Sequence, residues 1–188
     1  WNLARFAECL IPLIDKNEDQ AIKTATQIID NFQTIYEQKW LDMMKSKLGL
    51  IGDNKDDLKL INSLLNWMKE SKADYTNTFC YLMDMPIKDE IYNDKRFIEW
   101  VQAWNNRSTL NNSNKENQIQ FMKKVNPVII PRNHKVEAAL SDADKNNYET
   151  LYKLLSVIQN PYNPKVDVSE YQSLAPISKE KYQTFCGT

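Results

Sequence analysis

The spacing of the apolar residues constrains this chain most strongly, because they recur at intervals of three and four along most of its length. This spacing places apolar side chains on one face of an α-helix. The alternation of apolar and polar residues that predicts a β-strand does not extend over any length of the chain, and no internal repeat is found. The sequence therefore predicts an all-α fold.

The longest predicted helix lies near the N-terminus. A first helix is expected from Trp1 to Ile14, and Pro12 should bend or end it. Asn17 then provides an N-cap for one amphipathic helix of about 30 residues, which should end at Gly49. Further helices are expected around residues 58–68, 97–104, 119–125, 136–143 and 151–158.

Two polar stretches are expected between these helices. Residues 74–79 should form a turn, because Asp74 and its neighbours can cap it with their side chains. Residues 105–114 should form a loop, since Leu110 is their only apolar residue. Prolines then mark an extended tail after Asn160.

The charge balance excludes several kinds of partner. Lys and Arg total 24 against 25 Asp and Glu, so the net charge of −1 gives no attraction to nucleic acid or to an anionic membrane. No apolar run approaches the roughly 18 residues that span a bilayer. Three scattered cysteines are too few for a disulfide scaffold, which favours a reducing compartment. No nucleic acid and no membrane is expected as a partner.

The chain also lacks the residues that usually hold a phosphate or a metal. Only three glycines are present, whereas a P-loop or a dinucleotide-binding loop needs several close together. The Asp-Phe-Gly and His-Arg-Asp triplets of protein kinases are missing. A single histidine and three cysteines without CxxC spacing argue against a metal site. No catalytic, cofactor-binding or metal-binding residue is therefore expected in this chain.

The most unusual stretch is residues 126–134, Asn-Pro-Val-Ile-Ile-Pro-Arg-Asn-His. Its two prolines fix an extended segment that presents Arg132, Asn133 and His134 at the start of the next helix, where Asn133 would be the N-cap. Arg132 could form a bidentate pair with a carboxylate or a phosphate. Alternatively, Arg132 is structural and locks the helices together by bridging a buried Glu or a helix C-terminus.

The cysteines allow two interpretations. A Cys-dependent hydrolase would need His134 within hydrogen-bond reach of Cys80 or Cys186, and the simpler interpretation is that these residues are unrelated. Cys9 and Cys80 lie among apolar residues and are expected to be buried, inert thiols. Cys186, two residues from the end of the sequence, is expected to be exposed and able to reach a partner thiol.

A series of motifs runs through the whole chain in a fixed order. They are Trp1-Asn2-Leu3-Ala4-Arg5 with Ala7-Glu8, Lys47-Leu48-Gly49, Asp74-Tyr75-Thr76 with Phe79, Trp104 with Arg107, Asn126-Pro127 with Ile130-Pro131-Arg132-Asn133-His134, Asn160-Pro161-Tyr162 and Phe185-Cys186-Gly187-Thr188. This ordered set resembles the selenoprotein O-like (YdiU-type) protein adenylyltransferases, although Cys80 stands where the family pattern has an arginine.

The resemblance implies a protein-kinase-like fold, of which this chain would be the helical C-terminal part. Residues 1–105 would be C-lobe-like helices, and residues 106–188 a helical extension with an extended tail, together in one compact unit. Members of the family bind ATP in a flipped pose with Mg²⁺ or Mn²⁺ and transfer AMP to Ser, Thr or Tyr hydroxyls of proteins. Their nucleotide and metal ligands precede the Trp-Asn-Leu motif, so none is expected here.

The resemblance also implies partners and a regulatory thiol. The partners would be a kinase-like N-terminal half, expected to precede Trp1, and the protein substrates of the parent enzyme. Cys186 matches a C-terminal cysteine or selenocysteine that can pair with a cysteine of the activation-loop region. The compartment would be the bacterial cytoplasm, or the mitochondrion in a eukaryote. The alternative, from another class, is a free-standing helical interaction module that docks through its long helix or its Arg132 region.

Overall fold

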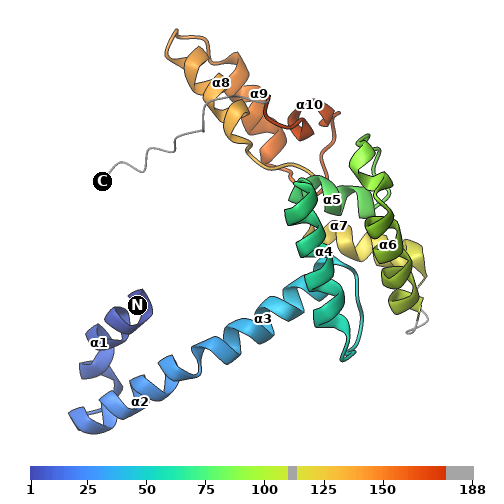
Figure 1. Cartoon of the computed structure of the whole chain (residues 1–188). Helices are drawn as coiled ribbons and strands as arrows, with labels where there is room; N and C mark the ends of the chain where they lie inside the picture. Colours follow the sequence, from blue (N-terminus) through green and yellow to red (C-terminus); the bar gives the residue numbers. More distant parts are fainter. Residues whose placement is uncertain (110–113, 177–188) are drawn as a thin grey trace. The chain divides into compact units, whose positions relative to one another are not determined.

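The computed structural model describes residues 1–109 and 114–176. Throughout these ranges the chain forms helices joined by turns and short extended segments, without a β-strand, which confirms the all-α prediction (Figure 1). Among the same residues, no helix is both long enough and apolar enough to span a bilayer.

Ten α-helices and one 3₁₀ helix follow one another in the described part of the chain. They are α1 (Asn2–Ile14), α2 (Glu18–Asp30), α3 (Phe32–Lys47), α4 (Asp57–Ser71), α5 (Tyr75–Leu82), η1 (Glu90–Asn93), α6 (Lys95–Thr109), α7 (Lys115–Val125), α8 (Asn133–Ala143), α9 (Glu149–Ile158) and α10 (Ser169–Gln172).

Contacts along the chain group it into two compact units, one from Trp1 to Lys45 and one from Ser46 onward. The change from one unit to the other falls inside the last turns of α3. The boundary expected between residues 105 and 106 falls inside α6, and as a division between kinase-like lobe and extension it stays a prediction.

The first unit consists of α1, α2 and most of α3. Its helices α1 and α2 pack against each other. No residue of α1 is buried, and α2 buries only Ala21 and Ala25. Pro12 lies inside α1, which ends two residues later at Ile14. The first unit therefore has very little core of its own.

The single long helix expected up to Gly49 is wrong, because it is interrupted at Asn31. The backbone N–H of Asn31 donates to Gln27 and Ile29, which closes α2, and α3 starts afresh one residue later. Asp30 and Asn31 both have low helix propensity, since their side chains compete for backbone hydrogen bonds. The expected end is confirmed: α3 stops at Lys47, and Gly49 takes the left-handed φ of +64°.

Aromatic residues form the core of the second unit. Trp67 stacks on Phe97 with 4.3 Å between ring centroids, and Trp100 stacks on Trp104 at 6.0 Å. Each of these buried indoles has a partner for its N–H, such as the carbonyl of Leu48, which lies 2.9 Å from Nε1 of Trp104. These tryptophans therefore fix the directions of α4 and α6 as well as filling space.

Two segments expected to be irregular are helical instead. Residues 105–109 continue α6, since their buried members Arg107 and Ser108 face the core; residues 110–113 lie outside the described part of the chain. The turn expected at residues 74–79 is the first part of α5, which Asp74 caps through its side chain. In both places, contacts with distant parts of the second unit outweigh the polar composition of the local sequence.

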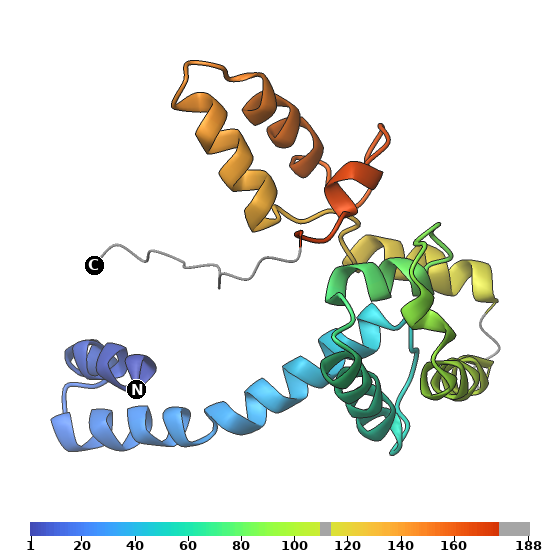
Figure 2. The same ribbon diagram turned by 45° about the horizontal axis from the view of Figure 1, so that its top comes forward.

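The C-terminal part of the second unit is a pair of helices, α8 and α9, followed by the short α10. Figures 1 and 2 show α8 and α9 side by side, and the two pack on each other. Their buried residues are Ala139, Leu154 and Val157. The helix predicted around residues 136–143 is thus confirmed as α8.

Candidate functional site

The proline-bracketed segment before α8 is fixed to the rest of the second unit by its backbone and by one asparagine. The amide Nδ2 of Asn126, a fully buried residue, donates to the carbonyls of Lys47 at 2.8 Å and Met122 at 3.0 Å. The N–H of Val128 donates to the carbonyl of Pro161 at 2.7 Å. The extended segment therefore has a defined path, and the position of Arg132 follows from it.

Arg132 forms a bidentate pair with Asp74, at the start of α5. Its Nη1 lies 2.8 Å from Oδ2 of Asp74, and its Nη2 lies 3.0 Å from Oδ1. The two side chains are only 10% and 19% exposed. The pair bridges two elements of this chain, and the partner of Arg132 is an Asp at a helix N-terminus, not the expected Glu or helix C-terminus.

Asp74 has a second task, because it also caps α5. Its Oδ1 accepts a hydrogen bond of 2.8 Å from the backbone N–H of Asn77. Burial alone would raise the pKa of Asp74, but the hydrogen bonds from Arg132 and Asn77 outweigh it and hold the pKa below its ordinary value. Asp74 therefore stays ionised and joins the helix cap to the ion pair.

Asn77 and Gln172 extend this cluster to α10. Oδ1 of Asn77 accepts from Nη2 of Arg132 at 3.1 Å, and its Nδ2 donates to the carbonyl of Gln172 at 3.1 Å. Nε2 of Gln172 in turn donates to the carbonyl of Val128 at 3.0 Å. We call Asp74, Asn77, Arg132 and Gln172 the polar latch. Together they hold the segment before α8 and the helix α10, which follows α9, to α5.

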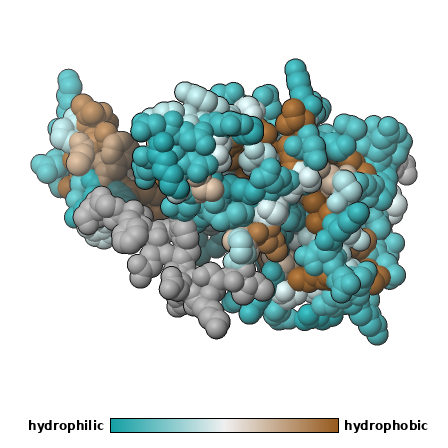
Figure 3. Space-filling model, turned by 90° about the horizontal axis from the view of Figure 1, so that it is seen from above, coloured by the Kyte–Doolittle hydropathy of each residue, from teal (hydrophilic) through white to brown (hydrophobic). Residues whose placement is uncertain are grey.

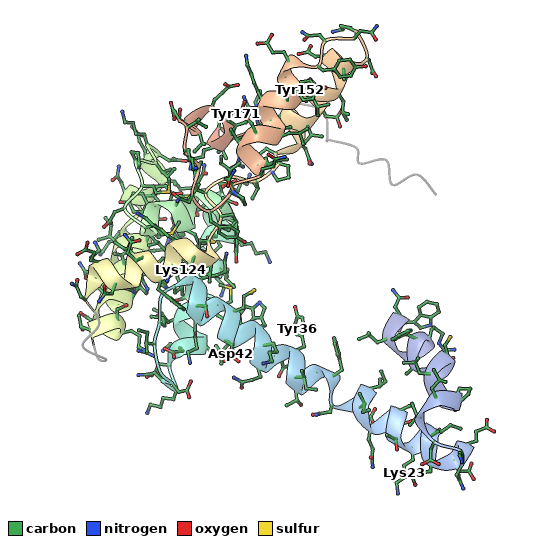
Figure 4. The ribbon with its side chains drawn as sticks, turned by 180° about the vertical axis from the view of Figure 1, so that it is seen from behind. Lys23, Tyr36, Asp42, Lys124, Tyr152 and Tyr171 are labelled. Atoms are coloured by element: carbon green, nitrogen blue, oxygen red, sulfur yellow. The ribbon has the colours of Figure 1, made fainter. Side chains whose placement is uncertain are left out.

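A second contact joins α8 to α10 at the surface. The ammonium of Lys135 lies 2.8 Å from a carboxylate oxygen of Glu170 and 5.7 Å from the ring centre of Tyr171. Tyr171 is labelled on α10 in Figure 4. Because Glu170 is 73% exposed, this pair adds orientation more than stability.

The cysteines agree only in part with expectation. Cys80 is buried next to the polar latch, and burial, with the nearby charge of Asp74, raises the pKa of its thiol to about 11. The prediction that Cys80 is buried is confirmed, and its raised pKa disfavours the thiolate that a cysteine nucleophile needs. The prediction for Cys9 is wrong, because this thiol is exposed on α1, where no partner in the first unit covers it. Cys186 lies outside the described residues.

The three residues singled out by sequence have different roles. Arg132 is the N-cap residue of α8, while Asn133 is its first helical residue, so the predicted Asn133 cap is wrong. The side chain of Arg132 makes no capping hydrogen bond and pairs with Asp74 instead. His134 is partly exposed beside a shallow cleft of about 370 Å³. Partial burial, together with the positive charges of Lys135 and Arg132, lowers the pKa of His134 and favours the neutral imidazole.

Arg107 and Asp57 form a buried ion pair that the sequence did not predict. Nε of Arg107 lies 2.6 Å from Oδ1 of Asp57, and Nη2 lies 3.0 Å from Oδ2. The same Nη2 donates to the carbonyls of Ile51 and Gly52. Arg107 thereby closes the segment between α3 and α4. Its place in a motif was the only signal, because nothing in the sequence links it to a carboxylate 50 residues away.

Arg107 and Arg132 are already paired with carboxylates of this chain. The guanidinium groups of Arg107 and Arg132 are both directed at carboxylates of this chain, which leaves neither free to hold a phosphate. In the ranges 1–109 and 114–176, no three His, Cys, Asp or Glu side chains are grouped to hold a metal ion. The arrangement of these two arginines positions helices.

These features define a helical protein region whose buried charges hold its own elements together. A family model described as "Protein adenylyltransferase SelO" matches residues 1–159. The chain belongs to this family, which confirms the resemblance seen in its motifs.

Relatives of known name match the chain over its full length. It is 51% identical over 189 residues to the "Protein nucleotidyltransferase YdiU" of Pelagibacter ubique, and 44% identical to the proteins of the same name from Nitrosococcus oceani and Brevibacillus brevis. All of this chain is covered, but only 39%, 38% and 39% of those three proteins. The chain therefore spans about two-fifths of the length of these relatives.

Proposed function

We propose that this chain is the C-terminal helical region of a protein adenylyltransferase with a pseudokinase fold, and that it supports a catalytic half formed by other residues. One observation carries this proposal: the whole chain matches its relatives but covers only 38–39% of their length. Arg107 and Arg132 both bind carboxylates of the chain itself, which supports a structural role.

In this proposal the two halves of the protein have different roles. The N-terminal half binds ATP with Mg²⁺ or Mn²⁺ and transfers AMP to Ser, Thr or Tyr of protein substrates. The present chain contributes no catalytic, cofactor-binding or metal-binding residue. It holds its helices in place through the Arg107–Asp57 and Arg132–Asp74 pairs. Cys186 serves as a redox thiol. The compartment is the bacterial cytoplasm, or the mitochondrion if the source is eukaryotic.

Calorimetric titration of the 188-residue chain with Mg-ATP tests the first half of this proposal. We expect no binding, because Arg107 and Arg132 already bind carboxylates of this chain. Binding with micromolar affinity would contradict the assignment of roles.

A chimera tests the second half. In it, the matching 189 residues of the Pelagibacter ubique protein are replaced by this chain, and AMP transfer to added proteins is followed by mass spectrometry. We expect the chimera to transfer AMP and the isolated chain to be inactive. A chimera that folds but cannot transfer AMP would count against the proposal.

A free-standing interaction module is the second candidate, and the exposed apolar side chains of the first unit favour it. The genomic reading frame separates the two candidates. A frame that continues upstream of Trp1 into a kinase-like segment supports the adenylyltransferase, whereas a start codon directly before Trp1 supports the module.

A further inference from the structure

Large apolar side chains are exposed across the first unit. Phe6 and Ile28 are each 61% exposed, and Phe32 is 46% exposed. Leu3, Ile14, Ile22, Ile35, Tyr36 and Met43 are exposed as well. In Figure 3 hydrophobic residues gather at the surface on the left of the view, where the first helices lie. A monomer rarely exposes so many apolar residues together unless the surface binds something.

These side chains form a groove that lies entirely within the first unit. It has a volume of about 320 Å³. Its walls come from α1, α2 and the start of α3, and every residue that lines it is apolar, including Leu3, Phe6, Ile28 and Phe32. Without a polar group to orient a small ligand, such a groove suits the apolar face of another protein element.

The composition of α1 supports the same conclusion. The helix is apolar on the side that lines the groove, yet none of its residues is buried. An amphipathic helix of this size owes most of its stability to burial of its apolar face. The partner surface that α1 requires is therefore not supplied by α2 and α3, the other helices of its unit.

We propose that this groove, defined by α1, α2 and the start of α3, binds an apolar surface of the remaining part of the full-length family protein. The inference rests on the proposed function, and it names the surface through which the two parts join. The relatives carry this region together with more than half of their length in addition. A partner in the same polypeptide has a high effective concentration, so a groove of modest size suffices to hold it.

Thiol alkylation tests this directly, because it reports whether a position is covered. Ile28→Cys and Leu3→Cys place reporters on two walls of the groove, one on α2 and one on α1. Leu13→Cys is the matched control, since Leu13 lies on α1 and is 82% exposed but does not line the groove. Each variant is made in the 188-residue chain and in the chimera with the Pelagibacter ubique protein, and peptide mass spectrometry assigns the alkylated site.

In the chimera we expect alkylation of the two groove reporters to slow by on the order of tenfold or more relative to the isolated chain, because covered thiols react only after local opening. The control should keep its rate in both. Equal rates at the groove reporters in the two proteins would overturn the proposal. Protection already present in the isolated chain would also overturn the proposal. If that protection rises with protein concentration, a second copy covers the groove; if it does not, the chain itself covers it.

This outcome is independent of AMP transfer. A chimera that is inactive but protected at the groove would support the docking surface and refute the proposed activity. A chimera that is active but unprotected would support the proposed activity and refute the docking surface.

Discussion

Arg107 and Arg132 each bind one carboxylate through two N–H groups, but the pair of Arg107 is less exposed to solvent. The side chains of Arg107 and Asp57 are 8% and 2% exposed. The backbone N–H of Asn54 also donates to Asp57, at 3.1 Å. A carboxylate this deeply buried is tolerated only while its partners remain, so the cost of removing Arg107 comes mainly from the charge left behind.

We therefore predict that Arg107→Leu lowers the free energy of unfolding by about 3–5 kcal/mol, the usual cost of leaving a buried charge unpaired. The double variant Asp57→Leu with Arg107→Leu should recover part of this loss, since it removes both charges. Urea unfolding followed by circular dichroism measures both.

Arg96→Leu is the control for this experiment. Arg96 also pairs with acidic residues, Glu70 and Asp94, but it is 56% exposed. Its replacement should move the urea midpoint far less than Arg107→Leu, because water solvates exposed ion pairs. Equal shifts of the urea midpoint for the two variants would show that the buried pair stabilises the fold no more than an exposed one.

The pH dependence of stability provides a second prediction, at Asp74. Because the pKa of Asp74 in the folded chain lies below its ordinary value of 3.8, its ionised form stabilises the fold above that pH, and this contribution is lost as the pH falls below it. Asp74→Asn keeps an acceptor for the helix cap but loses the ion pair.

At pH 7 this variant should be less stable than the natural chain by about 2 kcal/mol, the usual value of hydrogen bonds to a charged group. The difference should shrink as the pH falls below 3.8, and urea unfolding at a series of pH values measures it. A difference that stays constant down to pH 3 would mean that the charge of Asp74 does not matter.

At the scale of elements, Gly49 decides where α3 ends. Its φ of +64° is a conformation that other residues adopt at a cost, and a Cβ there would lie 2.5 Å from Cγ of Gln118. Gln118 itself is buried and donates to the carbonyl of Leu48 and to Oγ of Ser108. The end of α3 and the packing of α7 thus depend on the same missing side chain.

Gly49→Ala should destabilise the chain by about 3 kcal/mol or more, from the left-handed backbone and the displaced Gln118. Gly52→Ala is the matched variant: it has a similar φ of +69° but is exposed, so it should cost only about 1–2 kcal/mol. Thermal unfolding of the two variants compares them. If both lower the melting temperature equally, the contact with Gln118 carries no cost.

The elements were predictable where apolar periodicity set them and not where distant contacts did. The helices α4, α8 and α9 follow their apolar spacing, and the end of α3 follows from Gly49. The last turn of α6 is polar in sequence, and it is helical because Arg107 reaches Asp57. Periodicity reports which face of a helix is apolar, but it cannot report a polar partner that tertiary folding brings near.

The candidate site shows the same limit. The two prolines before α8 allowed the extended segment and the importance of Arg132 to be inferred from sequence, but the N-cap was placed one residue too late. The choice between a carboxylate and a phosphate could not be made, because Asp74 precedes Arg132 by 58 residues and its own local pattern indicated a turn. Gln172 had no signal at all, since it lies in a region whose composition predicted only an extended tail.

At the scale of the whole molecule, the core is unevenly distributed. The buried apolar residues of the first unit are Ala21, Ala25 and Met44, whereas all the others follow Ser46. The Arg107–Asp57 and Arg132–Asp74 pairs and the aromatic cluster also lie in the second unit. Stability should therefore reside almost entirely in the second unit, and the first should depend on whatever surface covers its apolar groove.

This distribution predicts the behaviour of a shortened chain that begins at Phe32 and so keeps α3 whole. Removal of residues 1–31 takes away only two buried alanines, and each contributes little apolar area. The shortened chain should unfold cooperatively, with a urea midpoint close to that of the full chain.

A peptide of residues 1–45 should be partly helical at most and melt without a cooperative transition, because short helices without a core are marginal in water. If instead the shortened chain failed to unfold cooperatively while the peptide did, the core that stabilises this protein would have to involve α1 and α2, and the second unit could not be the independent support for a catalytic half that we propose.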